Sequence, residues 1–75
     1  KHYEEIANDY EGVTESFAVH AGKELRIMVE TDIISDLDAY KLAKAIAKDI
    51  EKSGEYSGIM KIHVFRETHV IEYAK

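Results

Sequence analysis

The segment 36–53 (DLDAYKLAKAIAKDIEKS) constrains the fold most, because its apolar residues recur at helical spacing throughout. These apolar residues fall within one arc of a helix and are Ala39, Leu42, Ala43, Ile46, Ala47 and Ile50. Ser35 followed by Asp38 is typical of a capping box, with Asp in place of Glu or Gln, and Gly54 is placed to end the helix. The segment therefore predicts an amphipathic helix with one core-facing side. Four lysines line its opposite side, at 41, 44, 48 and 52. Such a stripe is more often a solvated helix face than a binding site for a phosphate backbone.

A helix of this kind buries its apolar side against a second layer, and the chain offers strands for that layer. Period-two alternation over 17–19 and 25–29, on both sides of a loop carrying Gly22, predicts a β-hairpin. Residues 59–66 alternate again and predict a third strand. Residues 69–75 (HVIEYAK) predict either a last strand or an extended tail.

The order of these elements predicts the fold class. With a short helix expected at residues 1–9, the order is α-β-β-α-β-β. We expect an α+β two-layer sandwich, in which helices cover one face of a three- to four-stranded mixed sheet. Because the connection from residue 30 to residue 59 carries a helix, the third strand is expected to run parallel to the second.

The composition fits one small domain spanning residues 1–75. Of the 75 residues, 45% are apolar and 33% are charged, and the absence of cysteine excludes disulfides and thiolate metal sites. No apolar run approaches the length of a membrane span, and nothing resembles a signal peptide. Because the chain starts at Lys1, we expect it to be a fragment of a longer protein.

Nothing in the sequence predicts a catalytic site or a metal site. The four histidines, at 2, 20, 63 and 69, lie on different predicted elements and lack ligand spacing, so we expect no metal and no other cofactor to bind them. The serines fall at the ends of predicted elements, where they serve as caps and turns, and the glycines stand singly rather than in a phosphate-binding loop.

The side of the predicted sheet that faces away from the helices is more informative. We expect the long helix to cover one set of side chains, namely Phe17, Val19, Leu25, Ile27, Val29, Met60, Ile62 and Val64. Alternation then sends outward a set comprising Ala18, His20, Arg26, Met28, Lys61, His63 and Phe65. Leaving out Ala18, this set is the candidate interaction face.

Three interpretations of this face remain open. It could contact another protein, since Met, Phe and Arg are enriched at interface cores. It could stack on RNA bases and meet phosphates, although a net charge of −5 argues against strong unspecific attraction to nucleic acid. It could also be covered by another part of the same fold.

Three segments of the chain resemble the extreme C-terminal region of the ribonuclease Y family. They are EGVTESFAVHAGKELRIMV at 11–29, DLDAYKLAKAIAKDIE at 36–51, and Met60–Lys75 with its Arg66–Glu67–Thr68 and closing Glu72–Tyr73–Ala74–Lys75. These bacterial endoribonucleases belong to the HD-domain metal-dependent phosphohydrolases. None of the three segments is catalytic, and the resemblance rests on their order and spacing.

The resemblance implies a cytoplasmic parent that initiates decay of messenger RNA and is anchored to the cell membrane by an N-terminal helix. A coiled coil, a KH RNA-binding domain and a catalytic HD domain with a divalent metal would precede the present segment. The segment has no His-Asp dipeptide, so no catalytic or metal residue carries over to it. It is then expected to be a non-catalytic accessory module without membrane contact of its own. Its expected role is to pack on the HD domain, pair two subunits or dock partners. The first alternative is an RNA-contacting platform, and a second, a small-molecule regulatory domain, rests on fold analogy alone.

Overall fold

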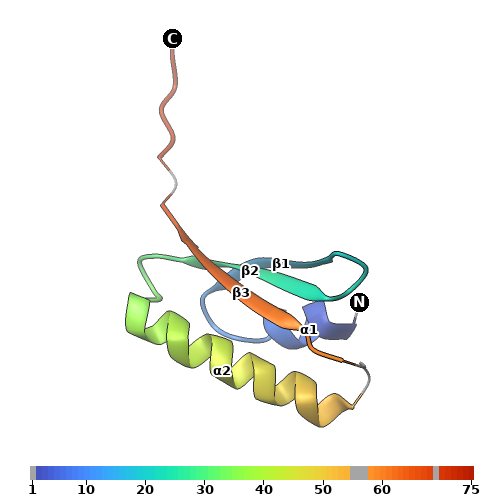
Figure 1. Cartoon of the computed structure of the whole chain (residues 1–75). Helices are drawn as coiled ribbons and strands as arrows, with labels where there is room; N and C mark the ends of the chain where they lie inside the picture. Colours follow the sequence, from blue (N-terminus) through green and yellow to red (C-terminus); the bar gives the residue numbers. More distant parts are fainter. Residues whose placement is uncertain (1, 55–57, 69) are drawn as a thin grey trace.

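The computed structural model describes residues 2–54, 58–68 and 70–75. Its elements are α1 (His2–Asn8), β1 (Val13–Val19), β2 (Glu24–Glu30), α2 (Asp36–Ser53) and β3 (Lys61–Glu67). The strands form one sheet and both helices lie on the same side of it, with α2 running along β3 (Figure 1). The predicted α+β two-layer fold is confirmed.

The three strands follow one another in the order β1-β2-β3, with β1 antiparallel to β2 and β3 parallel to β2. The predicted hairpin and the predicted direction of the third strand are thus confirmed. β3 begins at Lys61, two residues later than predicted, and residues 70–75 form an extended tail that leaves the body of the molecule (Figure 1). The tail is therefore the correct one of the two alternatives for the last segment. His69 lies outside the described residues.

The long helix begins and ends as the sequence predicts. The Ser35 hydroxyl accepts the Asp38 backbone N–H at 3.1 Å, and the Asp38 carboxylate accepts the Ser35 backbone N–H at 3.3 Å. Gly54 ends the helix in the left-handed conformation, with a φ of 64°. This reciprocal cap satisfies two N–H groups that the first turn of a helix leaves without intrahelical partners.

The core lies between the central strand and the helices. Its buried residues come from α1, β2, the loop after β2, and α2, and are Ala7, Leu25, Ile27, Val29, Ile34, Leu42, Ile46 and Ile50. The Tyr10 hydroxyl, in the segment between α1 and β1, donates a hydrogen bond to the Asp49 carboxylate on α2. That hydrogen bond, with partial burial and the negative charge of Asp49, raises the pKa of Tyr10 to about 12.

The predicted facing of β1 is wrong by one residue. Ala18 pairs with Leu25 and packs on the core, whereas Phe17 pairs with Arg26 on the opposite face of the sheet, and Val19 lies on that face as well. The reason is that α1 lies directly on β1: the Ser16 hydroxyl donates to the Asn8 side chain at 2.8 Å. So close a helix leaves room only for small side chains, which are Ser16 and Ala18.

We predict that G12A destabilises the fold more than G22A. Both glycines have a positive φ, 92° and 80°, so alanine is strained at either position. At Gly12, however, a new Cβ would lie 2.7 Å from the Ile34 side chain, whereas at Gly22 nothing lies within 4 Å. Overpacking should make G12A the costlier change by about 1–3 kcal/mol. Urea unfolding of both variants measures the difference, and equal losses would contradict the close approach.

A candidate interaction face on the open side of the sheet

The face of the sheet away from the helices brings most of the candidate residues together. In the register of the parallel pair, Arg26 lies beside His63 and Met28 beside Phe65, while Lys61 lies beside Glu24. His20 is not on a strand: it begins the turn between β1 and β2, with a φ of 56°. We call this surface the open face; it is formed by Glu24, Arg26 and Met28 of β2, Lys61, His63 and Phe65 of β3, and Phe17 and Val19 of β1.

Glu24 is the residue that sequence reasoning missed. Its side chain is only 7% exposed, and its carboxylate accepts the Arg26 Nε–H at 3.1 Å. His63 Nδ1 and His20 Nε2 each lie 3.3 Å from the same carboxylate. The sequence did contain a signal for the contact between Glu24 and Arg26, because the two residues are two positions apart on one strand and therefore share a face.

The carboxylate of Glu24 is held in its charged form. Burial alone would raise its pKa, but the hydrogen bonds from Arg26 and His63, and the positive charges of Arg26 and Lys61, outweigh burial. The pKa of Glu24 therefore lies below its ordinary value. Although two histidines and one carboxylate meet here, the described residues include no group of three or more His, Cys, Asp or Glu side chains suited to a metal ion.

The centre of the open face is apolar and aromatic, and acidic side chains on the same face border it: Glu15 beside Met28, and Glu30 beside Glu67. The His63 and Phe65 rings stack with centroids 3.9 Å apart and planes inclined by 22°. Met28 lies beside Phe65, and Phe17 and Val19 extend the surface over β1. These apolar and aromatic side chains are half-buried. Because the Arg26 guanidinium contacts Glu24, the positive charge of Arg26 is compensated within the chain.

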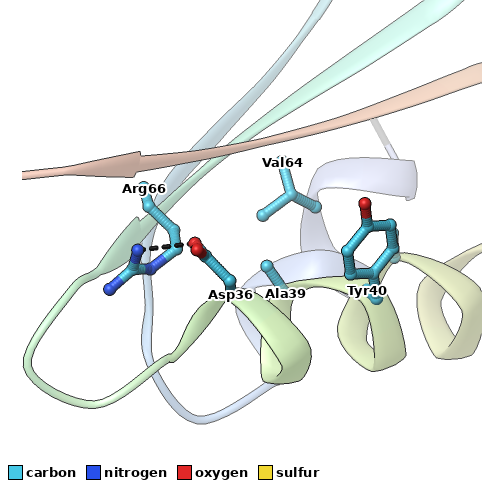
Figure 2. Close-up of a pocket in the computed structure, with 6 residues that line it drawn as sticks. Asp36, Ala39, Tyr40, Val64 and Arg66 are labelled. Carbon is cyan, nitrogen blue, oxygen red and sulfur yellow. Dashed lines mark hydrogen bonds and ion pairs between the residues drawn. The ribbon is translucent and has the colours of Figure 1, made fainter.

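A groove lies on the other side of the sheet, between α2 and β3 (Figure 2). Its volume is about 430 Å³, and it is lined by Asp36, Ala39, Tyr40, Ala43, Val64 and Arg66. Arg66 closes one end, where its guanidinium donates to the Asp36 carboxylate at 2.6 Å. The lining residues thus form a surface groove that contains one ion pair, between Arg66 and Asp36.

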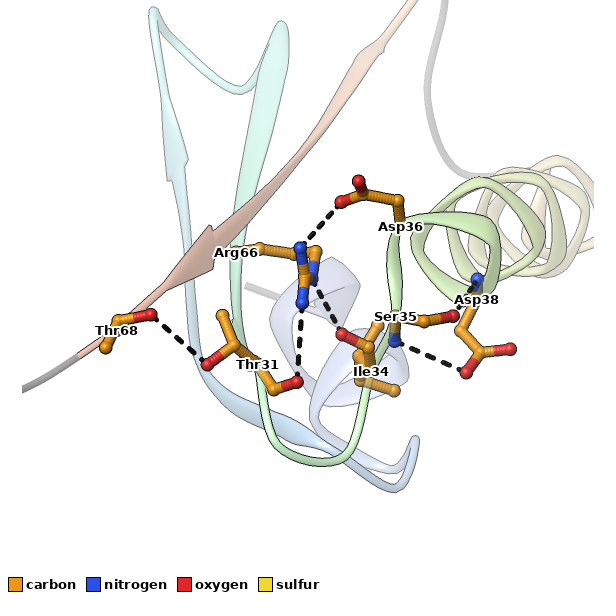
Figure 3. A network of polar contacts seen from close by, with 7 residues as sticks. All are labelled: Thr31, Ile34, Ser35, Asp36, Asp38, Arg66 and Thr68. Carbon is orange, nitrogen blue, oxygen red and sulfur yellow. Dashed lines mark hydrogen bonds and ion pairs between the residues drawn. The ribbon is translucent and has the colours of Figure 1, made fainter.

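Arg66 also ties β3 to the loop between β2 and α2 (Figure 3). Its Nε–H donates to the Ile34 carbonyl at 2.7 Å, and a second guanidinium N–H donates to the Thr31 carbonyl at 3.4 Å. The hydroxyls of Thr31 and Thr68 lie 3.4 Å apart in the same network. These contacts position the start of α2 and explain Arg66 as a structural residue.

We predict that Glu24 makes stability fall in acid. Since the pKa of Glu24 is lowered by folding, its stabilisation is fully present above the ordinary glutamate pKa of about 4.3 and is lost as the pH falls through the folded-state value. Urea unfolding at neutral pH and at low pH should therefore show a smaller acid-induced loss for E24Q than for the unchanged chain. E15Q, at an exposed position of β1, is the matched control and should behave like the unchanged chain. Identical pH dependence of E24Q and the unchanged chain would contradict the assignment.

We predict that R66A lowers the free energy of unfolding by about 1–3 kcal/mol, because it removes charge-assisted hydrogen bonds to two backbone carbonyls. D36A should cost less than about 1 kcal/mol, because the Asp36 side chain is exposed and surface ion pairs contribute little. Urea unfolding of the two variants gives the comparison. An equal loss would show that the ion pair, rather than the carbonyl contacts, holds the loop.

Comparison with known proteins supports the resemblance seen in the three segments. The chain is 54% identical over 72 residues to ribonuclease Y of Geobacillus thermodenitrificans and to ribonuclease Y of Bacillus subtilis, and 53% identical to ribonuclease Y of Bacillus cereus. Each alignment covers 96% of this chain but only 14% of the relative. No family model matches the chain, and no solved structure matches it. Neither described helix is long and apolar enough to cross a membrane.

Proposed function

Because this chain is homologous to the C-terminal part of ribonuclease Y, we propose that it is a non-catalytic accessory module that docks on the catalytic domain of such an enzyme through its open face. Two further contacts belong to the proposal: pairing of two subunits and docking of other proteins. In this proposal, hydrolysis of RNA is the work of the parent's HD domain and its divalent metal. The parent itself acts in the cytoplasm and is anchored to the membrane by a helix outside this segment.

The observation that carries the proposal is the charge compensation at Glu24. Arg26 and His63 already contact one buried carboxylate, so the centre of the open face presents mainly apolar and aromatic surface. Protein interfaces have cores depleted in charge and enriched in aromatic residues, Met and Arg. A surface of Met28, Phe65, Phe17 and Val19 around one internally paired Arg has this composition.

RNA contact is the second candidate function, and the stacked rings of His63 and Phe65 favour it. Aromatic side chains alone do not hold a nucleic-acid backbone, since phosphate contacts supply most of the affinity. On the open face, Arg26 shares its charge with Glu24, and Lys61 is an exposed cation at the start of β3. This distribution of charge favours a protein partner over RNA for the open face.

We predict that the isotope-labelled chain, titrated with the separately produced catalytic domain of the same enzyme, shows NMR shifts at Met28, Phe65 and Phe17. M28E should weaken this binding at least about tenfold, since it places a charge at the centre of an apolar contact. K48E, at an exposed position of α2 on the other side of the molecule, is the matched control and should bind normally.

A second titration, with single-stranded RNA at low and moderate salt, tests the alternative. Shifts on the open face that appear only with RNA and weaken steeply with salt would replace protein docking by RNA contact. Absence of shifts with either titrant would overturn both functions of the open face.

A further inference from the structure

β3 is an edge strand whose outer side is open. It pairs with β2 on one side, and among the described residues no strand pairs with its other side. Figure 1 shows the edge facing outward along its whole length, with α2 beneath it. An uncovered edge carries a row of backbone N–H and C=O groups able to pair with another chain.

The hydrogen bonds of β3 identify which residues face that edge. The Lys61 N–H donates to the Lys23 carbonyl at 2.9 Å, so Lys61 directs its backbone groups toward β2. Backbone groups alternate in direction along a strand, and therefore Ile62, Val64 and Arg66 direct theirs outward. At the other edge of the sheet, a backbone group of β1 already has a partner within the chain: the Glu4 carboxylate on α1 accepts the Ala18 N–H at 2.8 Å.

The residue order of β3 (KIHVFRE) is complementary to itself in the antiparallel direction. If two copies pair about a twofold axis at Val64, each Val64 faces its counterpart, Ile62 faces Arg66, and these are the residues with outward backbone groups. The intervening residues form the closer side-chain pairs. Among them, Lys61 faces Glu67 of opposite charge, and His63 faces the aromatic ring of Phe65.

We propose that two copies of this chain pair through β3, antiparallel and about a twofold axis at Val64, so that their two three-stranded sheets become one continuous sheet. The inference rests on the proposed function, in which the module makes contacts for its parent enzyme, and it names a second copy as one partner. A twofold contact is closed, so it uses up both edges and does not propagate into a filament.

The groove between α2 and β3 gives this pairing a second point of contact. Its lining comes from α2 and β3 and includes no residue of β2, so it lies on the outer side of the helix, toward the open edge. Val64 in the groove is only partly buried, whereas Ile27 beside it on β2 is fully buried. A second copy continues the sheet past Val64 and brings its own Val64 and α2 to this side, where Tyr40 is 74% exposed.

Site-directed crosslinking tests the register, since the chain has no cysteine of its own. Hydrogen-bonded antiparallel partners have Cα atoms about 5.5 Å apart, within the disulfide range of about 4.4–6.8 Å. V64C should therefore form a covalent dimer with oxidised glutathione. I62C is the matched control, because two Ile62 Cα atoms would be separated by about 13 Å along the strands, beyond disulfide reach.

Sedimentation equilibrium tests the pairing without a crosslink. The mass of the unchanged chain should rise with concentration from 8.6 kDa toward twice that value. K61E and E67K should each weaken the dimer about tenfold, because each places like charges opposite one another at two symmetric positions. The K61E/E67K double variant should restore it, and K48E should have no effect. Circular dichroism confirms that each variant is folded.

A mass of 8.6 kDa at every concentration, equal crosslinking of V64C and I62C, or a double variant no better than the single ones would overturn the pairing. The mass and crosslinking results do not bear on docking to the catalytic domain, which M28E tests; K61E is kept out of that test because Lys61 also lies on the open face. Conversely, loss of catalytic-domain binding with the dimer intact would overturn the docking role alone.

Discussion

The packing of α2 on the central strand β2 is the interaction on which the rest of the structure depends. Leu25, Ile27 and Val29 of β2 and Leu42, Ile46 and Ile50 of α2 are all buried, and they make up most of the core. A sheet of three strands with two helices on one face has one strand that is covered well and two that are edges. At the β1 edge the Glu4 carboxylate of α1 accepts the Ala18 N–H, whereas among the described residues no strand pairs with the β3 edge and no helix covers the far face of the sheet. Both surfaces with a proposed role are uncovered because so small a domain has too few elements to cover every face and edge of its sheet.

Glu24 shows how polar residues on the uncovered face of a small sheet can pair with one another. The Glu24 carboxylate, at the start of the central strand, contacts Arg26 on its own strand, His63 on the neighbouring strand and His20 in the turn. The lowered pKa of Glu24 follows from these partners, and so does the loss of free positive charge on the face. The same cluster thus contributes to stability and reduces the uncompensated positive charge on the face.

The sequence was sufficient to predict the elements whose signals are local. The bounds of α2, its capping box at Ser35 and Asp38 and its left-handed end at Gly54 all depend on residues within a few positions of one another. The alternation that places Arg26, Met28, His63 and Phe65 on one face is local too. Whether these side chains bind anything is a separate question, and that role stays a prediction.

What could not be predicted depends on neighbours distant in sequence. Phe17 and Val19 are better core residues than Ser16 and Ala18 by hydrophobicity alone, yet the close approach of α1 to β1 reverses their facing. Glu24 is an ordinary strand-end acid in the sequence, and its role appears only when the parallel register sets His63 close to it. Period-two alternation identifies two faces of a strand but not which of them a helix will cover.

The open face and the β3 edge overlap only along β3, whose Lys61, His63 and Phe65 belong to both, and this has a consequence for how such a module can work. Side chains on the open face point away from the helices, whereas the backbone of Ile62, Val64 and Arg66 points along the plane of the sheet. Pairing through the edge leaves Met28 and Phe17 uncovered, on the same side of the joined sheet in both copies. One module can therefore hold a second copy and still present its open face twice. A twofold pair would offer two identical docking surfaces at a fixed spacing, and binding of two linked sites is tighter than binding of either alone.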